Sequence, residues 1–414
     1  MSGKQIRTTD FKTLFISNIR SYSMFVMLAI IMLVFAPLTK GANFSPRNFT
    51  NIFFQYSYVL ILAVGMVQCI IILGIDLSVG SVCAFVGALS MYVYNGTGGN
   101  MALALLAALG LGLAIGAFQG VWIAFAKLPA FIVTLAGMML FRGLTYIVTK
   151  IAPVSPVKIP GKSYDFLSTG TLDEVLGVKP FINIPGETAF DSGFKLYPLP
   201  LLVGAVVVVV FIVSSILSRN KRIAHDFAVS GTPVFAAKLV IFSVLIMALM
   251  ERFAEYRGLP VVLIVVGITV FVFYFILNNT VVGRYIYAVG GNARSAKLSG
   301  ISPELINFIV FSFMGMLSGL AAVVSTGYMN TALPQAGLNF EMDAIAGCYI
   351  GGVSAAGGVG SVLGVIVGAL VMSAINNGMV LMNLGTHYQY VVRALILLLA
   401  VFYDVYTRSK TGLG

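Results

Sequence analysis

The chain has 414 residues, of which 59% are hydrophobic and 9% are charged, and its formal net charge is +11. Because a soluble domain carries about 25% charged residues, this composition excludes a water-soluble globule and indicates a surface that faces lipid or other protein. The basic residues lie between apolar runs rather than along one face. That placement excludes a nucleic-acid-binding surface and is typical of charges that set membrane topology. The three cysteines lie far apart without metal-ligand spacing, so no metal and no cofactor is expected.

Long apolar runs predict an all-α polytopic membrane protein with about 10–12 transmembrane segments. The candidate segments are 22–38, 53–74, 79–94, 101–126, 128–149, 197–218, 236–256, 259–277, 304–326, 342–353, 361–383 and 387–405. Segment 342–353 is too short to span a bilayer alone, and segment 79–94 begins at a glycine-rich break. Either one could be a half-span or a re-entrant piece.

The positive-inside rule orients these segments, because most basic residues in the connections fall on one side of the membrane. Both termini are then expected in the cytoplasm. The predicted regions are a cytoplasmic N-terminus (1–21), a first transmembrane half (22–149), an extracytoplasmic loop (150–196), additional transmembrane helices (197–277) with a cytoplasmic loop at 219–235, a cytoplasmic coupling loop (278–303), a second transmembrane half (304–405) and a cytoplasmic tail (406–414).

Two stretches, 53–149 and 304–405, look like copies of one unit built from four segments. In each copy the second segment opens with an aspartate and a glycine four residues later, the third carries glycines every four residues, and the fourth contains one arginine. The matching residues are Asp76 and Gly80 with Asp343 and Gly347; Gly112, Gly116 and Gly120 with Gly360, Gly364 and Gly368; and Arg142 with Arg393. The copies would enter the membrane from opposite sides, which predicts an inverted repeat with broken helices, as in many transporters. The alternative is chance similarity between glycine-rich membrane helices.

The run 74–81 interrupts an apolar stretch with Asp76, Ser78 and Gly80. Backbone leaves helical form at membrane depth only where protein or a water-filled path satisfies its polar groups. This segment is therefore a hinge or a break beside the translocation path. The alternative is the capped start of the next helix, with Asp76 or Ser78 as the cap.

Arg142 and Arg393 are intramembrane charges that each need a partner. A structural ion pair with Asp343, near Glu341, is favoured over direct substrate contact. A second polar set offers amide and phenol groups that suit the hydroxyls of a sugar, although amides also join membrane helices. The candidates for the translocation path or for helix breaks are Asp76, Ser78, Gly80, Asp343, Asn376, Asn377, Tyr388 and Gln389, with His387 beside the last two.

The sequence contains no phosphate-binding loop, no HExxH zinc motif and, with only two histidines, no plausible hydrolase triad. It therefore shows no catalytic site, and ATP hydrolysis is expected on a separate subunit. Two other classes remain open. An ion-coupled secondary transporter would suit the intramembrane charges, whereas an intramembrane enzyme or a structural membrane protein would need a catalytic cluster or would lack a polar path.

The loop 278–303 carries the strongest local pattern. Asn292 can cap a short helix over 293–299, Gly300 can end it in the left-handed conformation, and Ser302 can cap the next span. A rigid capped helix between two spans is suited to receiving force from another protein, whereas a basic topology loop needs no such caps. The candidate coupling residues are Gly290, Gly291, Asn292, Ala293, Arg294, Ala296, Lys297, Leu298, Ser299 and Gly300.

The run from Gly290 to Ile301 is similar to the coupling loop of the ribose/xylose/multiple-monosaccharide ABC permease family. Residues 74–81, 343–346, 351–352 and 357–358 resemble further motifs of that family. The resemblance covers about 50–150 and 280–405, whereas 197–277 adds spans to the short ribose-type pattern, as the xylose and multiple-monosaccharide branch does.

The resemblance implies a homodimeric channel in the bacterial cytoplasmic membrane. It also implies an ATP-binding subunit docked on the coupling loop and an extracytoplasmic sugar-binding protein. Xylose or several monosaccharides are the implied substrates, and related branches carry nucleosides or amino acids.

Overall fold

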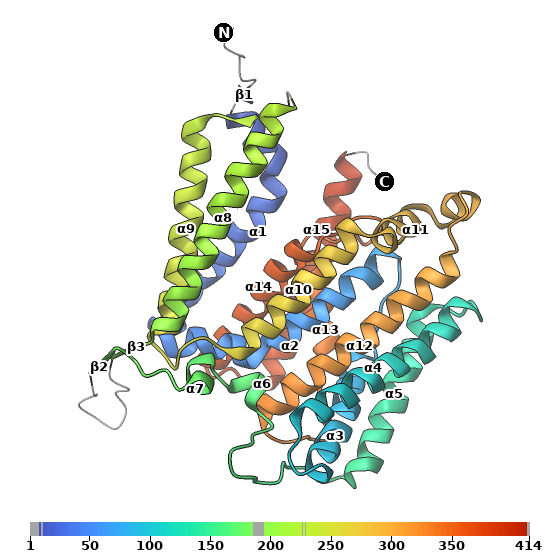
Figure 1. Cartoon of the computed structure of the whole chain (residues 1–414). Coiled ribbons are helices and arrows are strands. Elements are labelled where there is room, and N and C mark those ends of the chain that lie inside the picture. Colours follow the sequence, from blue (N-terminus) through green and yellow to red (C-terminus); the bar gives the residue numbers. More distant parts are fainter. Residues whose placement is uncertain (1–7, 10, 185–193, 226, 228, 412–414) are drawn as a thin grey trace. The chain divides into compact units, whose positions relative to one another are not determined.

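The computed structural model describes residues 8–9, 11–184, 194–225, 227 and 229–411, which are mostly helical (Figure 1). The long helices are α1 (Phe11–Leu38), α2 (Pro46–Ile71), α3 (Val79–Gly96), α4 (Met101–Ala124), α5 (Ala130–Thr149), α8 (Pro198–Ala224), α9 (Thr232–Ala254), α10 (Val261–Asn279), α11 (Val281–Leu298), α12 (Pro303–Met329), α13 (Phe340–Ile350), α14 (Val362–Leu381) and α15 (Thr386–Thr411). The short elements are the 3-10 turn Ala42–Phe44, α6 (Phe166–Thr169), α7 (Leu172–Leu176), β1 (Thr8–Thr9) paired with β4 (Val229–Ser230), and β2 (Ile182–Ile184) paired with β3 (Phe194–Leu196).

Each predicted apolar segment is a helix, which confirms the all-α polytopic architecture. Within the described residues, nine helices are long and apolar enough to cross a membrane, namely α2, α3, α4, α5, α8, α9, α10, α12 and α14. Helices α1 and α15 carry shorter apolar stretches, Met24–Leu38 and Thr386–Phe402. Helix α13 has 11 residues, about 16 Å at 1.5 Å per residue, so it covers half of a bilayer core of about 30 Å. Helix α13 is therefore too short to span alone, as predicted for 342–353, whereas α3 is long enough to cross.

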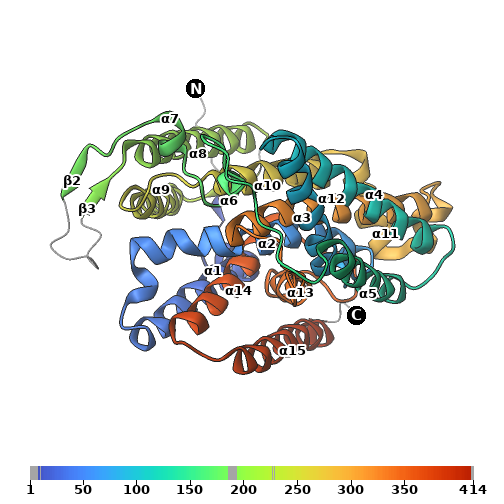
Figure 2. The same ribbon diagram turned by 90° about the horizontal axis from the view of Figure 1, so that it is seen from below.

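The chain divides into two compact units. The first comprises residues 1–26, 44–50 and 171–260, and the second comprises 27–43, 51–170 and 261–414. In the first unit α8 and α9 pack side by side (Figure 1, Figure 2), and the guanidinium of Arg219 lies 4.5 Å from the ring centroid of Phe235. Of the additional helices predicted over 197–277, α8 and α9 belong to this unit and α10 to the second.

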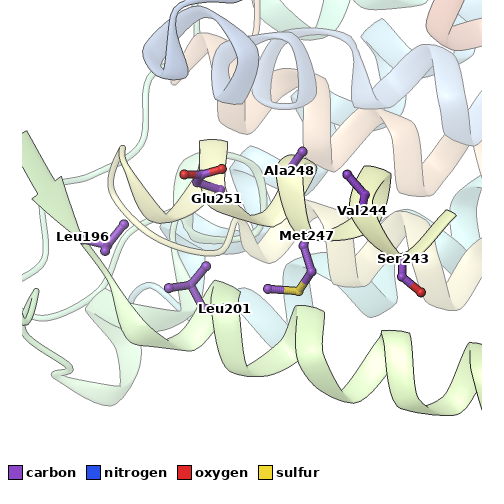
Figure 3. Close-up of a pocket in the computed structure, with 7 residues that line it drawn as sticks. All are labelled: Leu196, Leu201, Ser243, Val244, Met247, Ala248 and Glu251. Atoms are coloured by element: carbon purple, nitrogen blue, oxygen red, sulfur yellow. The ribbon is translucent and has the colours of Figure 1, made fainter. Parts of the chain in front are cut away.

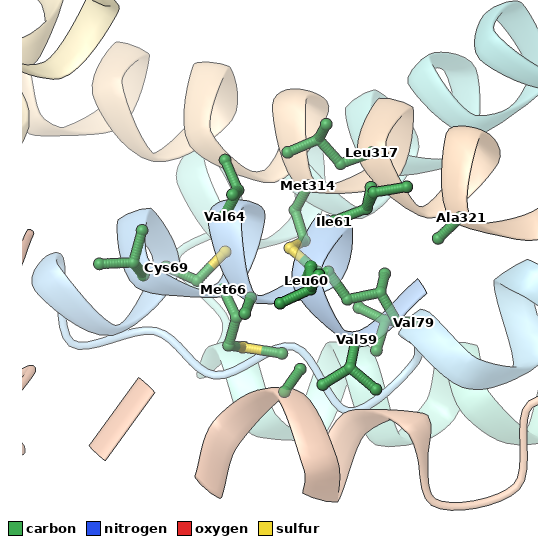
Figure 4. Close-up of a cluster of buried hydrophobic side chains, with 14 of the residues drawn as sticks. Val59, Leu60, Ile61, Val64, Met66, Cys69, Val79, Met314, Leu317 and Ala321 are labelled. Carbon is green, nitrogen blue, oxygen red and sulfur yellow. The ribbon is translucent and has the colours of Figure 1, made fainter. Parts of the chain in front are cut away.

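Helix α2 lies in the middle of the second unit, and its apolar side chains are buried all round. Figure 4 shows Ile61 and Val64 of α2 facing Met314 and Leu317 of α12, whereas Val59 points to the opposite side of α2. A helix that is apolar on every side is buried in this way only when other helices surround it. The second unit is therefore built around α2.

Helices α4 and α12 meet through glycines rather than through side chains. A Cβ atom added at Gly112 would overlap the carbonyl of Gly315, and one added at Gly319 would overlap the carbonyl of Ala108. Because the residue numbers rise along one helix and fall along the other, the two helices are antiparallel. Small residues let membrane helices approach to backbone contact and so gain van der Waals energy.

The two proposed copies of the repeat, 53–149 and 304–405, share one packing scheme. Helix α3 packs against α4 and α5 in the first copy, and α13 packs against α14 and α15 in the second. Helix α3 also packs on α12, the first helix of the second copy, where the Cys83 thiol donates to the Ser318 carbonyl. Helix α13 likewise packs on α2, the first helix of the first copy, where the Cys348 thiol lies 3.6 Å from the Ala63 carbonyl. This reciprocity supports the duplication. The opposite orientation of the copies in the membrane stays a prediction.

Gly112→Ala and Gly110→Ala are a matched pair of substitutions on α4. A Cβ atom at position 112 meets the backbone of α12, whereas one at position 110 meets open space. We expect Gly112→Ala to lower the free energy of unfolding by about 1–3 kcal/mol through overpacking. Gly110→Ala should leave it unchanged or slightly higher, because alanine favours a helix. Thermal unfolding in detergent measures the difference, and equal melting temperatures would show that α4 and α12 do not meet at these glycines.

Candidate translocation and coupling sites

The break between α2 and α3 is closed by its own polar side chains. Asp76 Oδ1 accepts hydrogen bonds from the backbone N–H of Ser78 (2.8 Å) and from the Ser78 hydroxyl (2.6 Å). Ser78 occupies the N-cap position of α3, but its side chain accepts no bond from the helix backbone. Ser78 therefore does not cap α3 through its side chain, whereas the Asp76 carboxylate accepts the N–H of Ser78 at the start of the helix.

Helices α4 and α5 hold the break in place. The side-chain amide of Gln119 in α4 donates to the Ser78 hydroxyl (2.9 Å), and the hydroxyl of Thr134 in α5 donates to the carbonyl of Ile75 (3.2 Å). Asp76, Ser78 and Gln119 are all buried. The polar groups of the break are thus satisfied by protein, which is the condition for irregular backbone at membrane depth. Sequence analysis missed Gln119, although an amide between Gly116 and Gly120 in an apolar run was a usable signal.

Gly80 lies at a close backbone contact. A Cβ atom at Gly80 would overlap the carbonyl of Gly337, which has φ +74°, and would stand 2.7 Å from the Glu341 carboxylate. The start of α3 therefore packs on the turn that precedes α13. Gly80 allows this approach and offers no polar group to a translocated solute.

Three polar side chains tie the half-span α13 to α14 and α15. Arg393 Nη1 lies 3.6 Å from Asp343 Oδ2, and Arg393 Nε donates to Asn376 Oδ1 (2.9 Å). The side chain of Asp343 is 0% exposed and that of Arg393 is 17% exposed. Charges this deeply buried are tolerated because they are paired. The expected ion pair of Asp343 thus forms with Arg393.

Arg142 has different partners. Its Nη1 atom donates to the backbone carbonyls of Ala336 (2.5 Å) and Pro334 (3.2 Å) in the turn before α13. The alternative pairing of Asp343 with Arg142 is therefore wrong. Both arginines nevertheless hold the start of the half-span, Arg142 through backbone and Arg393 through a carboxylate.

The second polar set is not one site. Asn376 and Asn377 are buried in α14, whereas the Tyr388 side chain is 59% exposed. Gln389 donates to the carbonyl of Leu384 (2.8 Å), and the ring of His387 lies 4.3 Å from that of Tyr388. Asn376 and Asn377 are therefore separate from Tyr388, because α14 carries the two buried asparagines and α15 carries the exposed tyrosine.

A groove of 530 Å³ lies in the first unit, between α8 and α9 (Figure 3). Leu201, Val244 and Met247 give it an apolar lining, with the Glu251 carboxylate among the lining groups. None of the predicted path residues lines it. Its apolar character matches the exposed aliphatic side chains of both helices, so it is part of their lipid-facing surface.

Helix α11 is two helical pieces joined at Asn292, whose backbone is extended (φ −161°, ψ 100°). The Asn292 side chain accepts from the N–H of Ser295 (2.9 Å), which caps the second piece. That piece ends where the N–H of Gly300 (φ +83°) donates to Lys297 and that of Ile301 donates to Ala296. These two bonds define a Schellman motif, so the capped helix predicted over 293–299 is confirmed.

The next span begins just after this helix. The Ser302 hydroxyl accepts from the N–H of Leu305 (3.2 Å), and Pro303 occupies the first turn. Gly290 and Ala296 face the protein, whereas the other candidate coupling residues are exposed, and the Leu298 side chain is 87% exposed. Lys297 bonds Glu304 across the turn (3.0 Å). The geometry gives a short, fixed helix with one free face.

We expect Asp343→Asn to lower stability by about 3–5 kcal/mol, because it leaves the Arg393 charge buried without its carboxylate. The double variant Asp343→Asn, Arg393→Gln should recover part of the loss. Adding Arg142→Gln to Asp343→Asn should recover none, because Arg142 does not contact Asp343. Melting temperatures of the three purified variants provide the measurement. An unchanged melting temperature in Asp343→Asn would mean that the carboxylate is not paired.

Comparisons with known proteins agree with this architecture. The family described as the permease component of branched-chain amino acid transport systems matches residues 48–177 and 167–401. The xylose transport system permease protein XylH of Haemophilus influenzae is 35% identical over 95% of this chain and 98% of its own length. XylH of Escherichia coli K12 is 34% identical over 95% and 94%, and the ribose import permease protein RbsC of the same strain is 32% identical over 91% and 92%.

No solved structure matches the chain. The family match and the relatives both extend over most of its length. The chain therefore belongs to this family of ABC transport-system permeases, as the membrane-spanning subunit and not the ATPase.

Proposed function

We propose that the chain forms the membrane path of an ATP-driven, binding-protein-dependent importer of monosaccharides, either xylose or several sugars. The observation that carries this proposal is the full-length similarity to xylose and ribose permeases, at 32–35% identity. The description of the family itself keeps amino-acid transport as a second candidate. Nucleosides and other small polar solutes are further candidate substrates.

We assign the capped helix 293–299 to docking of a cytoplasmic ATP-binding subunit. This assignment rests on a mechanical requirement, because a partner can drive the channel only through an element of fixed shape at the membrane surface. The two caps and the exposed face of Leu298 supply such an element. A homodimer in the bacterial cytoplasmic membrane, with both termini inside and a sugar-binding protein outside, completes the proposed system.

The buried charges have a structural part in this scheme. Asp76 and Ser78 fix one helix break, and Asp343 with Arg393 fixes the other. We assign these residues to holding the broken segments, which are the elements that can shift as the path opens. We expect direct contact with a sugar at other surfaces, including the one that carries Tyr388.

Reconstituted vesicles test the proposed function. The purified chain alone should hydrolyse no ATP above background, because it has no phosphate-binding loop. With its ATPase and binding protein added, it should accumulate labelled xylose or ribose, and amino acids and nucleosides serve as the competing solutes. Accumulation of a sugar by the chain alone would contradict the proposal in favour of an ion-coupled carrier, and accumulation of only a competitor would correct the substrate.

Gly291→Leu tests the coupling helix. A Cβ atom at position 291 would have no described atom within 4 Å, and the residue is exposed, so the fold should survive while docking of the ATPase is blocked. We expect co-purification of the ATPase and sugar uptake to fall at least tenfold. Arg294→Ala and Lys297→Ala should have smaller effects, because an exposed charge contributes about 1 kcal/mol or less.

Gly267→Leu is the control, since Gly267 is likewise exposed in a helix, α10, with no described atom within 4 Å of an added Cβ atom. It should leave uptake and co-purification unchanged. If Gly291→Leu behaves like this control, the ATPase docks elsewhere.

A further inference from the structure

The first piece of α11 is fastened to the interior of the second unit by a tyrosine. The Tyr287 hydroxyl donates to the backbone carbonyl of Gly360 (2.8 Å), in the turn between α13 and α14. The ring is half-buried, and burial raises the pKa of the Tyr287 phenol above its usual range. The hydroxyl is therefore protonated at physiological pH and is available as a donor.

One turn further along α11, Gly290 makes a second attachment. A Cβ atom at Gly290 would overlap the carbonyl of Ile71, and this same carbonyl accepts a hydrogen bond from the N–H of Gly358 (2.9 Å). Gly357 and Gly358 have φ of +78° and +69°, a region that favours glycine. Three chain segments thus meet at backbone level around the Ile71 carbonyl, and no side chain separates them.

The segments that meet there are those that adjoin the broken helices. Ile71 is the last residue of α2, directly before the break that holds Asp76. Gly358 and Gly360 lie in the turn that follows the half-span α13. Helix α11 therefore contacts the end of α2, where the break begins, and the turn that follows the half-span α13.

We propose that Tyr287 is a positioning residue for coupling, which ties the ATPase-docking helix to the turn between α13 and α14 so that both broken segments move with it. This inference rests on the proposed function. The first piece of α11 also packs against α10 and α12 and buries Ile286 and Val289. The Tyr287 hydroxyl adds a hydrogen bond to the turn before α14, about one turn from the Gly290 contact, so this piece is joined to the turn at two points.

Tyr287→Phe is the decisive variant, because it removes one hydroxyl and keeps the ring. Tyr285→Phe is its matched control, since Tyr285 lies on the same helix, is 38% exposed and makes no hydrogen bond through its hydroxyl to the described residues. Each variant is purified with its ATPase and reconstituted with the binding protein. The measurements are ATPase co-purification, melting temperature, and sugar molecules taken up per ATP hydrolysed.

We expect Tyr287→Phe to keep the ATPase bound and to lower the sugar taken up per ATP about two- to tenfold, the range that loss of one neutral hydrogen bond corresponds to. Tyr285→Phe should match the unmodified chain. An unchanged ratio in Tyr287→Phe overturns the inference, as does a fall in melting temperature that accounts for the whole loss of uptake at a constant ratio. Failure of the unmodified chain to retain any ATPase overturns the proposed function instead.

Discussion

The structure depends on one constraint, that every backbone polar group at membrane depth must be satisfied by protein or by a water-filled path. The chain departs from helical form between α2 and α3 and on both sides of α13, so these places need partners from other helices. Gln119 and Thr134 supply them at the first break, and Arg142 supplies two bonds to the carbonyls of the turn before α13. The positions of α4 and α5 follow from this requirement, because each must bring a polar side chain to the break.

Glycine makes those approaches possible. The contacts of α4 with α12, of Gly80 with Gly337 and of Gly290 with the Ile71 carbonyl are all backbone contacts that a Cβ atom would prevent. In a bilayer there is little hydrophobic driving force between helices, so association relies on close packing. Of these contacts, that of Gly290 places α11 against the segments that adjoin the breaks.

Family membership and geometry answer different parts of the functional question. The comparisons establish a permease component and its class of relatives. The geometry shows that the buried charges are occupied by structural partners, with Asp343 on Arg393 and Asp76 on Ser78. Intramembrane charge, often a sign of an ion or substrate pathway, here holds half-helices in place. The exposed Leu298 side chain of α11 and the exposed Tyr388 side chain of α15 face outward, where a partner or a solute can reach them.

The sequence by itself determined the helical segments, the short α13 and the caps at Asn292, Gly300 and Ser302. These features rest on interactions between residues at most five apart, so a linear pattern contains them. Only the tertiary structure decided that Asp343 pairs with Arg393 rather than Arg142, that Gly290 faces inward while Gly291 faces out, and that Asn376 and Tyr388 are separated. Such choices depend on how helices distant in sequence cross and rotate against one another, and the glycine contacts that fix those rotations join residues about 200 positions apart, as Gly112 and Gly315 do.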